Sequence, residues 1–164
     1  PIASISVSKN STRTGALIIF ERDNSLDDQI RTGTILDAET TAELLKNIFY
    51  PKAPLHDGAA IIRRGRIQAA GCMLPLSNNP NLSKELGMRH RAGIGMSEAS
   101  DAVVVIVSEE TGAISVAVNG MLKRHLTKDT FEKILRNELI PEVKEEPTGA
   151  FSFLRRKEKH KADE

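Results

Sequence analysis

The residues best suited to chemistry lie in one short turn, Pro54-Leu55-His56-Asp57-Gly58-Ala59. Pro54 restricts the residue before it to extended conformations, and Gly58 permits backbone angles or a close approach that a side chain would forbid, so the turn is expected to fix His56 and Asp57. Polar residues fixed in a loop on a packed scaffold are candidates for catalysis or binding. In the alternative interpretation, which the turn taken alone slightly favours, Asp57 closes an Asx-turn and His56 packs on the surface.

A second candidate group is the basic triplet Arg89-His90-Arg91. Arginine guanidinium groups match phosphate oxygens in a bidentate way, and the free amides and dipole at the start of a helix would add to the preference for an anion. The alternative is an exposed basic face. The exposed face is less favoured here because Gly87, Gly93 and Gly95 flank the triplet, and glycine lowers the stability of a helix that is merely solvated. Small residues there would let the helix approach the sheet or a ligand closely.

Together, the carboxylate and the arginine pair indicate phosphoryl or nucleotidyl transfer, with metal assistance left open. The chain contains no P-loop and no glycine-rich dinucleotide fingerprint, so the common nucleotide-binding folds are not supported. From the residues alone, the prediction therefore stops at a phosphorylated ligand.

Apolar patterning predicts the strands that position these groups. Continuous apolar runs favour buried strands, and the turns Arg63-Arg64-Gly65-Arg66 and Asn119-Gly120 each mark a reversal of the chain. Arginines exposed at such a turn are expected to be solvated rather than to bind an anion. The predicted strands cover residues 15–20, 59–62, 67–74, 102–108 and 114–118.

Helical spacing predicts two amphipathic helices. The first is expected to begin with Asp37 as its N-cap and to end at Pro51, directly before the turn that carries His56 and Asp57. The second is capped by Thr127 and ends at Pro141. Residues 26–36 are expected to form a polar connector. Strands and hairpins interspersed with helices predict the fold class, a single α/β domain with a central mixed β-sheet flanked by helices.

Length and composition limit the classes of function. The 164 residues are 40% hydrophobic, which suits one domain with a real core, predicted at residues 15–140 between a lead-in segment (1–14) and a charged tail (141–164). A formal net charge of +1 gives no overall attraction to nucleic acid, and with 4% aromatic residues a base-stacking platform for single strands has little to build on. Nucleic-acid binding is therefore not expected.

The single cysteine, Cys72, excludes an internal disulfide, fits a reducing compartment and is expected to be a small buried hydrophobic residue. No stretch approaches the roughly 20 apolar residues of a membrane helix, so this fragment is not expected to span a membrane. The sequence begins at Pro1 without an initiator Met, which suggests a piece of a longer protein.

The two candidate groups resemble the Asp-Gly-Ala and Arg-His-Arg signature motifs of diadenylate cyclases, in Asp57-Gly58-Ala59 and Arg89-His90-Arg91. Three intermediate segments are similar to the membrane-anchored, CdaA-type branch of that family: residues 74–77, 83–87 and 108–112. Two motifs in the right order, joined by matching segments, are far more specific than either motif alone. The resemblance covers roughly residues 15–139.

This resemblance implies condensation of two ATP molecules into cyclic di-AMP with release of two pyrophosphates. Two domains would meet face to face as a homodimer, each binding one ATP. Asp57 would activate the ribose 3′-hydroxyl, either as a general base or by organising a metal ion, and Gly58 and Ala59 would let the backbone lie against the nucleotide. Arg89 and Arg91, supported by His90, would neutralise the triphosphate.

The resemblance also implies residues around the nucleotide and a metal ion. Ser108 and Glu110 match positions at the nucleotide, and Leu74 sits where the adenine pocket is lined. Met73 stands where well-known relatives carry Tyr, and Met88 where they often carry Thr; methionine can pack on a base but cannot donate a hydroxyl hydrogen bond. The expected cofactor is Mn²⁺ or Mg²⁺, with His56 and Asp57 as candidate ligands.

By the same resemblance, the full-length protein would be anchored in the plasma membrane with this domain in the cytoplasm. Its implied partners are an extracytoplasmic YbbR-domain regulator and phosphoglucosamine mutase, which restrains the cyclase by blocking dimerisation.

Two other functions compete with the cyclase. A non-catalytic adenine-nucleotide-binding module of the same fold would have lost Asp57 or an arginine, and both motifs are intact. A metal-dependent phosphohydrolase using His56 and Asp57 would need several His and Asp ligands. The other histidines, His90, His125 and His160, are dispersed without ligand-like spacing.

Overall fold

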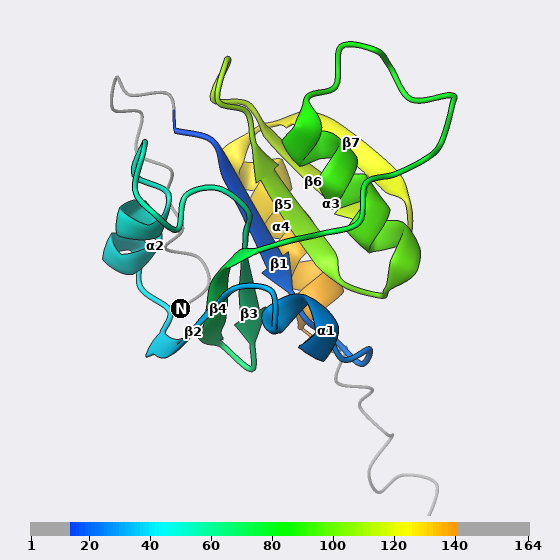
Figure 1. The fold of residues 1–164 in the computed structure, drawn as a ribbon. Helices are drawn as coiled ribbons and strands as arrows, with labels where there is room; N and C mark the ends of the chain where they lie inside the picture. The colour runs from blue at the N-terminus through cyan, green and yellow to red at the C-terminus, as the bar shows by residue number, and fades with distance from the viewer. Residues whose placement is uncertain (1–13, 141–164) are drawn as a thin grey trace, which may run out of the picture.

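The computed structural model describes residues 14–140, so the predicted lead-in up to residue 13 and the tail 141–164 lie outside the described residues. Seven strands and four helices make up this part of the chain (Figure 1). In chain order they are β1 (Ala16–Phe20), α1 (Asp27–Ile30), β2 (Thr34–Glu39), α2 (Ala42–Ile48), β3 (Ala59–Arg63), β4 (Arg66–Cys72), α3 (Met88–Ala99), β5 (Val103–Val107), β6 (Ile114–Val118), β7 (Met121–Leu126) and α4 (Lys128–Leu139).

All seven strands belong to one sheet in the order β2-β4-β3-β1-β5-β6-β7. Only β1 and β3 are parallel neighbours; every other pair is antiparallel. The predicted mixed sheet is therefore confirmed. Every residue of β1 and of β5 is buried, as expected for central strands covered on both faces.

Helices cover both faces of the sheet and give three layers. On one face, apolar side chains of α3 and of the α1 segment pack against alternate residues of the central strands; on the other face, α2 and α4 do the same. These side chains are Leu26, just before α1, with Ile30, Ile94 and Met96 on the first face, and Leu45, Ile48, Phe131 and Leu135 on the second. Figure 1 shows α3 in front of the sheet and α4 behind it. The core thus lies in two layers, one on each side of the sheet.

The prediction for residues 26–50 is partly wrong. The expected connector contains α1 and the beginning of β2, and Asp37, expected to cap a helix, lies inside β2 with a positive φ of 46°. Asp37 instead accepts a hydrogen bond from Arg66 Nε (2.8 Å) at an irregularity in the β2–β4 register. The helix begins later, where Thr41 accepts a hydrogen bond from the amide of Leu44 as its N-cap.

Both predicted chain reversals are confirmed. The arginine-containing turn joins β3 to β4, and Asn119 and Gly120, with φ of 51° and 78°, join β6 to β7, a strand that the sequence analysis missed.

Cys72 is fully buried, and burial raises the pKa of its thiol to about 11, which keeps it protonated. Among the described residues, no helix has the length and apolar character needed to cross a membrane.

Candidate active site

The sheet topology gathers the candidate residues on one side of the sheet, where neighbouring strands begin or end. We call this side the edge. Because β1 and β3 are parallel and β4 and β5 run antiparallel to them, the starts of β1 and β3 lie beside the ends of β5 and β4: Ala16 pairs with Val107, and Ala59 pairs with Cys72. The segments that carry Asp57, Met73 and Leu74, and Ser108 to Glu110 therefore open at the same edge. The N-terminus of α3 reaches this edge as well, because Arg89 pairs with Glu109.

The turn that carries Asp57 is fixed by backbone contacts. The amide of Ala53 donates to the carbonyl of Tyr50 (2.9 Å), and the amide of His56 donates to the carbonyl of Ala53 (3.1 Å). Gly58 has a φ of 106° and lies so close to β4 that a Cβ there would stand 2.7 Å from the carbonyl oxygen of Cys72. Only glycine satisfies both conditions, which explains the residue that follows the aspartate.

Asp57 itself is exposed, and within residues 14–140 its carboxylate has no hydrogen bond or ion pair, so it is available to a ligand. His56 differs because its Nδ1 lies 2.6 Å from the carbonyl oxygen of Ala53. A carbonyl can only accept, so Nδ1 carries a proton, and the neutral form of the ring would offer the lone pair of Nε2 to a ligand. Metal-binding histidines typically have this second bond to a carbonyl.

The donors at this turn fit one kind of metal site. Within the described part of the chain, no group of three or more His, Cys, Asp or Glu side chains could hold an ion by itself. Magnesium sites in nucleotide-handling enzymes commonly use one or two protein ligands together with substrate phosphates and water. The adjacent His56 and Asp57 suit that shared arrangement and not an all-protein cage.

A helix, α3, begins at the basic triplet and supplies the helix start that would favour an anion there. Its N-cap, Gly87, makes no side-chain cap, and no acidic residue lies in its first turn. Arg89 pairs with Glu109 and extends over Gly15, where a Cβ would stand 2.7 Å from its Nη1. Sequence reasoning missed Glu109 and Gly15, because nothing local in the sequence links them to Arg89.

Arg91 has different partners. Its Nε and Nη2 donate to the carbonyls of Leu86 and Ser83, both at 3.2 Å, which ties the loop before α3 to the helix. Two of the five N–H donors of the guanidinium are used in this way, which leaves three for a ligand.

His90, on α3, is partly buried and lies near Arg124 and His125 of β7. Burial lowers the pKa of its imidazole, and the nearby charges of Arg124 and His125 lower it further, so the ring is neutral near pH 7. A neutral ring adds no charge to the arginine pair but can donate one hydrogen bond. The prediction did not include Arg124 or His125, because it did not include β7.

The remaining predicted residues line the same edge. The amide of Ser108 donates to the carbonyl of Ala113 (2.9 Å), which closes the loop after β5, and Glu110 is exposed on that loop. Met73 and Met88 expose 72% and 65% of their surface, and Leu74 is partly buried. Arg89 pairs with Glu109, which was not predicted, and among the described residues no side-chain hydrogen bond or ion pair joins one predicted site residue to another.

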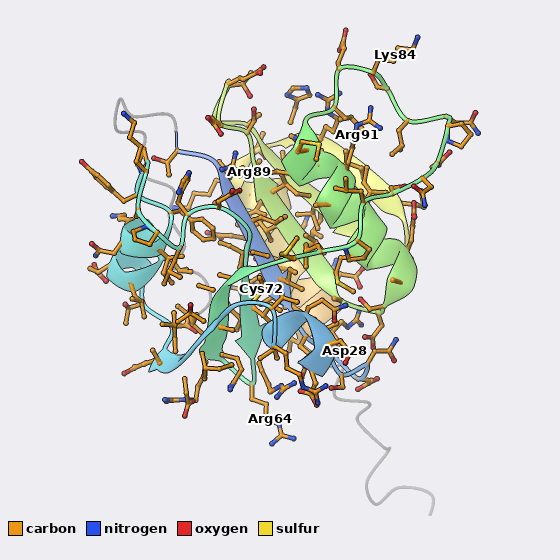
Figure 2. The ribbon with its side chains drawn as sticks, in the orientation of Figure 1. Asp28, Arg64, Cys72, Lys84, Arg89 and Arg91 are labelled. Carbon is orange, nitrogen blue, oxygen red and sulfur yellow. The ribbon has the colours of Figure 1, made fainter. Side chains whose placement is uncertain are left out.

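The arginines of the β3–β4 turn lie at the opposite edge, where Figure 2 shows Arg64 far from Arg89 and Arg91. Arg63 donates to both carboxylate oxygens of Glu21 (2.7 Å each) and to Asp27, and these bonds raise the pKa of its guanidinium. Burial raises the pKa of Glu21, but the bonds from Arg63 and from the Leu26 amide outweigh it and leave that pKa lowered. Two of the three arginines are thus structural, since Arg66 pairs with Asp37.

Comparison with known proteins places this site in a family. The family described as "DAC: DisA bacterial checkpoint controller nucleotide-binding" matches residues 5–122. Cyclic di-AMP synthase CdaA of Bacillus subtilis is 53% identical over 126 residues, which are 77% of this chain and 46% of that protein. A diadenylate cyclase of Listeria monocytogenes is 48% identical over 136 residues, 83% of this chain and 50% of that protein.

Solved structures give the same result. DacA from Staphylococcus aureus, as an N166C/T172C double mutant, superposes with a TM-score of 0.77 at 50% identity, covering 79% of this chain and 86% of that one. A hypothetical membrane spanning protein from Bacillus cereus gives a TM-score of 0.68 at 50% identity, covering 70% and 56%. The chain spans about half the length of the curated relatives it matches. On the family match, the shared motifs and the common fold, this chain belongs to the DAC family.

Proposed function

We propose that this chain is the catalytic domain of a diadenylate cyclase, which condenses two ATP molecules into cyclic di-AMP and two pyrophosphates. The observation that carries the proposal is the common sheet edge, where an unpaired carboxylate at Asp57 lies with Arg89 and Arg91 at the start of α3. The names of the curated relatives, cyclic di-AMP synthase and diadenylate cyclase, support the same reaction.

In the proposed reaction, Asp57 accepts the proton of a ribose 3′-hydroxyl. The oxygen then attacks the α-phosphorus of the opposite ATP, a new P–O bond forms, and the bond to the pyrophosphate oxygen breaks. The same step in the other direction closes the ring, so two bonds form and two pyrophosphates leave. Two domains must face each other for this geometry, and we propose a homodimer as the active form.

Positive charge at the edge would stabilise the triphosphate and the leaving pyrophosphate. Arg89 would exchange Glu109 for phosphate oxygens, and Arg91 would use its remaining donors. His90, as a neutral ring, would donate a single hydrogen bond. The exposed Met73 and Met88, with Leu74, Ser108 and Glu110, would border the nucleotide, while the Gly58-Ala59 backbone would allow its close approach.

A divalent ion, Mn²⁺ or Mg²⁺, would be held by Asp57 and by the free Nε2 of His56 together with the substrate. When bound, such an ion supplies positive charge that neutralises the triphosphate. An imidazole ligand favours Mn²⁺ over Mg²⁺.

We also propose a cellular setting on the likeness to CdaA-type relatives and to a protein titled membrane spanning. The domain, at residues 15–140, would lie in the cytoplasm and be attached to a membrane anchor in the full-length protein. Its partners would be a YbbR-domain regulator and phosphoglucosamine mutase.

The test is to incubate the protein with ATP and either Mn²⁺ or Mg²⁺ and to identify the products by mass-resolved chromatography. Cyclic di-AMP with pyrophosphate is the expected result. ADP or AMP without the cyclic product would indicate a phosphohydrolase, and unchanged ATP with measurable binding would indicate a non-catalytic nucleotide-binding module.

A further inference from the structure

One continuous segment, residues 71–77, connects the Asp57 turn to the arginine helix, and we call it the strap. At its start, Gly71 and Cys72 lie against the turn: a Cβ on Gly58 would stand 2.8 Å from the carbonyl carbon of Gly71 and 2.7 Å from the carbonyl oxygen of Cys72. Figure 1 shows the chain leaving β4, crossing in front of the sheet to α3 and looping outward before it enters that helix.

A second contact fixes the strap just beyond the sheet. The amide of Met73 donates to Thr32 Oγ1 (2.8 Å), and this hydroxyl in turn donates to the carbonyl of Gln29 (2.6 Å). The backbone at Met73 is therefore held from the α1 side while its side chain stays exposed.

The far end of the strap is bound to α3 by two hydrogen bonds. The amide of Ser77 donates to the carbonyl of Arg91 (3.0 Å), and its hydroxyl donates to Glu98 Oε1 (2.7 Å). Gly95 lies directly beneath the crossing, because a Cβ there would overlap the carbonyl oxygen of Pro75 and stand 2.7 Å from the amide nitrogen of Ser77. The strap thus touches the backbone of Arg91 itself.

Burial of apolar groups accounts for only the first part of the strap, where Cys72 is fully buried and Leu74 packs against the core. Met73, Pro75 and Leu76 are exposed, whereas Ser77 is 9% exposed and polar. The far part of the strap leaves its apolar side chains outside and buries a serine, so directed hydrogen bonds hold it, and such bonds specify position more than they add stability. Bonds that involve a charged acceptor, here the Glu98 carboxylate, are the stronger ones.

We propose that the Ser77–Glu98 hydrogen bond is a positioning latch that sets the wall formed by Met73 and Leu74 relative to the arginines of α3. This inference rests on the proposed function, in which that wall faces the adenine and the arginines face the phosphates of one ATP. Ser77 and Glu98 are positioning residues, since they touch neither Asp57 nor a phosphate-binding side chain. Because the latch fixes the wall before ATP arrives, it strengthens binding of substrate and transition state equally.

The test compares Ser77→Ala, Glu98→Ala, their double variant and Glu98→Gln with the wild type in KM, kcat, equilibrium ATP binding and thermal unfolding. Loss of a hydrogen bond to a charged group is expected to raise KM and the ATP dissociation constant about tenfold while kcat changes by less than about threefold. Glu98→Gln keeps an acceptor oxygen and should stay within about threefold of the wild type. Since both single variants break one bond, the double variant should be no worse than either.

Ser100→Ala is the matched control, because Ser100 donates to the carbonyl of Met96 (2.9 Å) on the same helix away from the strap, and it should leave KM unchanged. Glu98→Ala is the cleaner of the two single variants, since Ser77 Oγ also accepts from the amide of Asn79 (3.3 Å). Equal KM in all variants, a Gln variant as impaired as Ala, or a lower unfolding temperature without any change in ATP binding would overturn the latch.

Measuring ATP binding distinguishes a failure of the latch from a failure of the proposed function. A wild type that binds ATP but makes no cyclic di-AMP would refute the cyclase, while the ordering of dissociation constants among the variants would still decide the latch. A wild type that neither binds nor converts ATP would refute both.

Discussion

Asp57 and the two arginines differ in what they bind before any ligand arrives. Asp57 has no partner among the described residues, whereas Arg89 pairs with Glu109 and Arg91 holds the carbonyls of Ser83 and Leu86. The Glu109 side chain is 65% exposed, so breaking its pair with Arg89 costs little in water. We infer that Arg89 is the arginine that changes partner on ligand binding, while Arg91 can stay in place.

His90 gives a prediction for the pH dependence of stability. Its pKa in the folded protein lies below the 6.5 of a free imidazole, first because of burial and then because of Arg124 and His125. As pH falls below about 6.5, the unfolded chain takes up a proton that the folded protein resists, so the free energy of unfolding decreases. His90→Gln should therefore remove part of this acid loss.

Urea unfolding of both proteins from about pH 8 to about pH 5 checks the prediction. His125→Gln is the comparison variant, since it removes an exposed histidine whose effect on the His90 pKa is the smallest of the three, and it should relieve much less of the acid loss than His90→Gln does. A slope against pH that is the same in His90→Gln and the wild type would contradict the assignment.

At the scale of elements, α3 depends on two glycines that meet different neighbours. A Cβ on Gly93 would stand 2.8 Å from Cδ1 of Ile106, the mobile end of a side chain, whereas a Cβ on Gly95 would overlap the backbone of the strap at Pro75. Helix propensity alone would make either change to alanine favourable by about 1 kcal/mol. The steric clash makes both changes unfavourable instead, and more so at Gly95, where the Cβ would meet backbone atoms.

We therefore expect Gly95→Ala to destabilise the protein by about 1–3 kcal/mol and Gly93→Ala to cost less. Denaturant midpoints of the two variants provide the measurement, and each variant serves as the control for the other. If Gly95→Ala is as stable as the wild type, the strap does not lie against the helix as described.

The sequence patterns predicted the elements whose signals are local. The runs in β1 and β5, the β3–β4 hairpin and the Thr127 cap of α4 are confirmed because burial and turn chemistry act over a few residues. Asp37 misled the prediction, since an N-cap signal also fits an aspartate with positive φ at a strand irregularity. β7 has no clean alternation, because it is an edge strand with most residues exposed.

The candidate site also has a part that the sequence predicts and a part that only the fold reveals. The Asp57 turn and the arginine triplet are visible as short motifs, but their meeting at one edge depends on strand order, which no local pattern encodes. The Arg89–Glu109 pair and the Ser77–Glu98 bond join residues 20 and 21 positions apart through the fold. Such partners become visible only in three dimensions.

At the scale of the whole molecule, the proposed reaction needs two active chains. Product formed per chain should rise with protein concentration. Adding an excess of Asp57→Asn protein at saturating ATP should suppress the wild type, because most wild-type chains would then be paired with an inactive partner. The same excess of wild-type protein is the control and should raise the yield. Suppression by the variant supports a shared site. An unchanged yield per wild-type chain would show that each chain acts alone.

In the proposed reaction, Asp57 takes a proton from the substrate hydroxyl. The most direct measurement is the single-turnover rate of cyclic di-AMP formation and the ATP dissociation constant for the wild type, for Asp57→Asn and for Asp28→Asn, an exposed aspartate on α1 at the opposite edge (Figure 2). We predict that Asp57→Asn lowers the rate by about 10²–10⁴-fold, a far larger factor than the one by which it weakens ATP binding, and that Asp28→Asn matches the wild type. A rate for Asp57→Asn within a few-fold of the wild type would contradict the account.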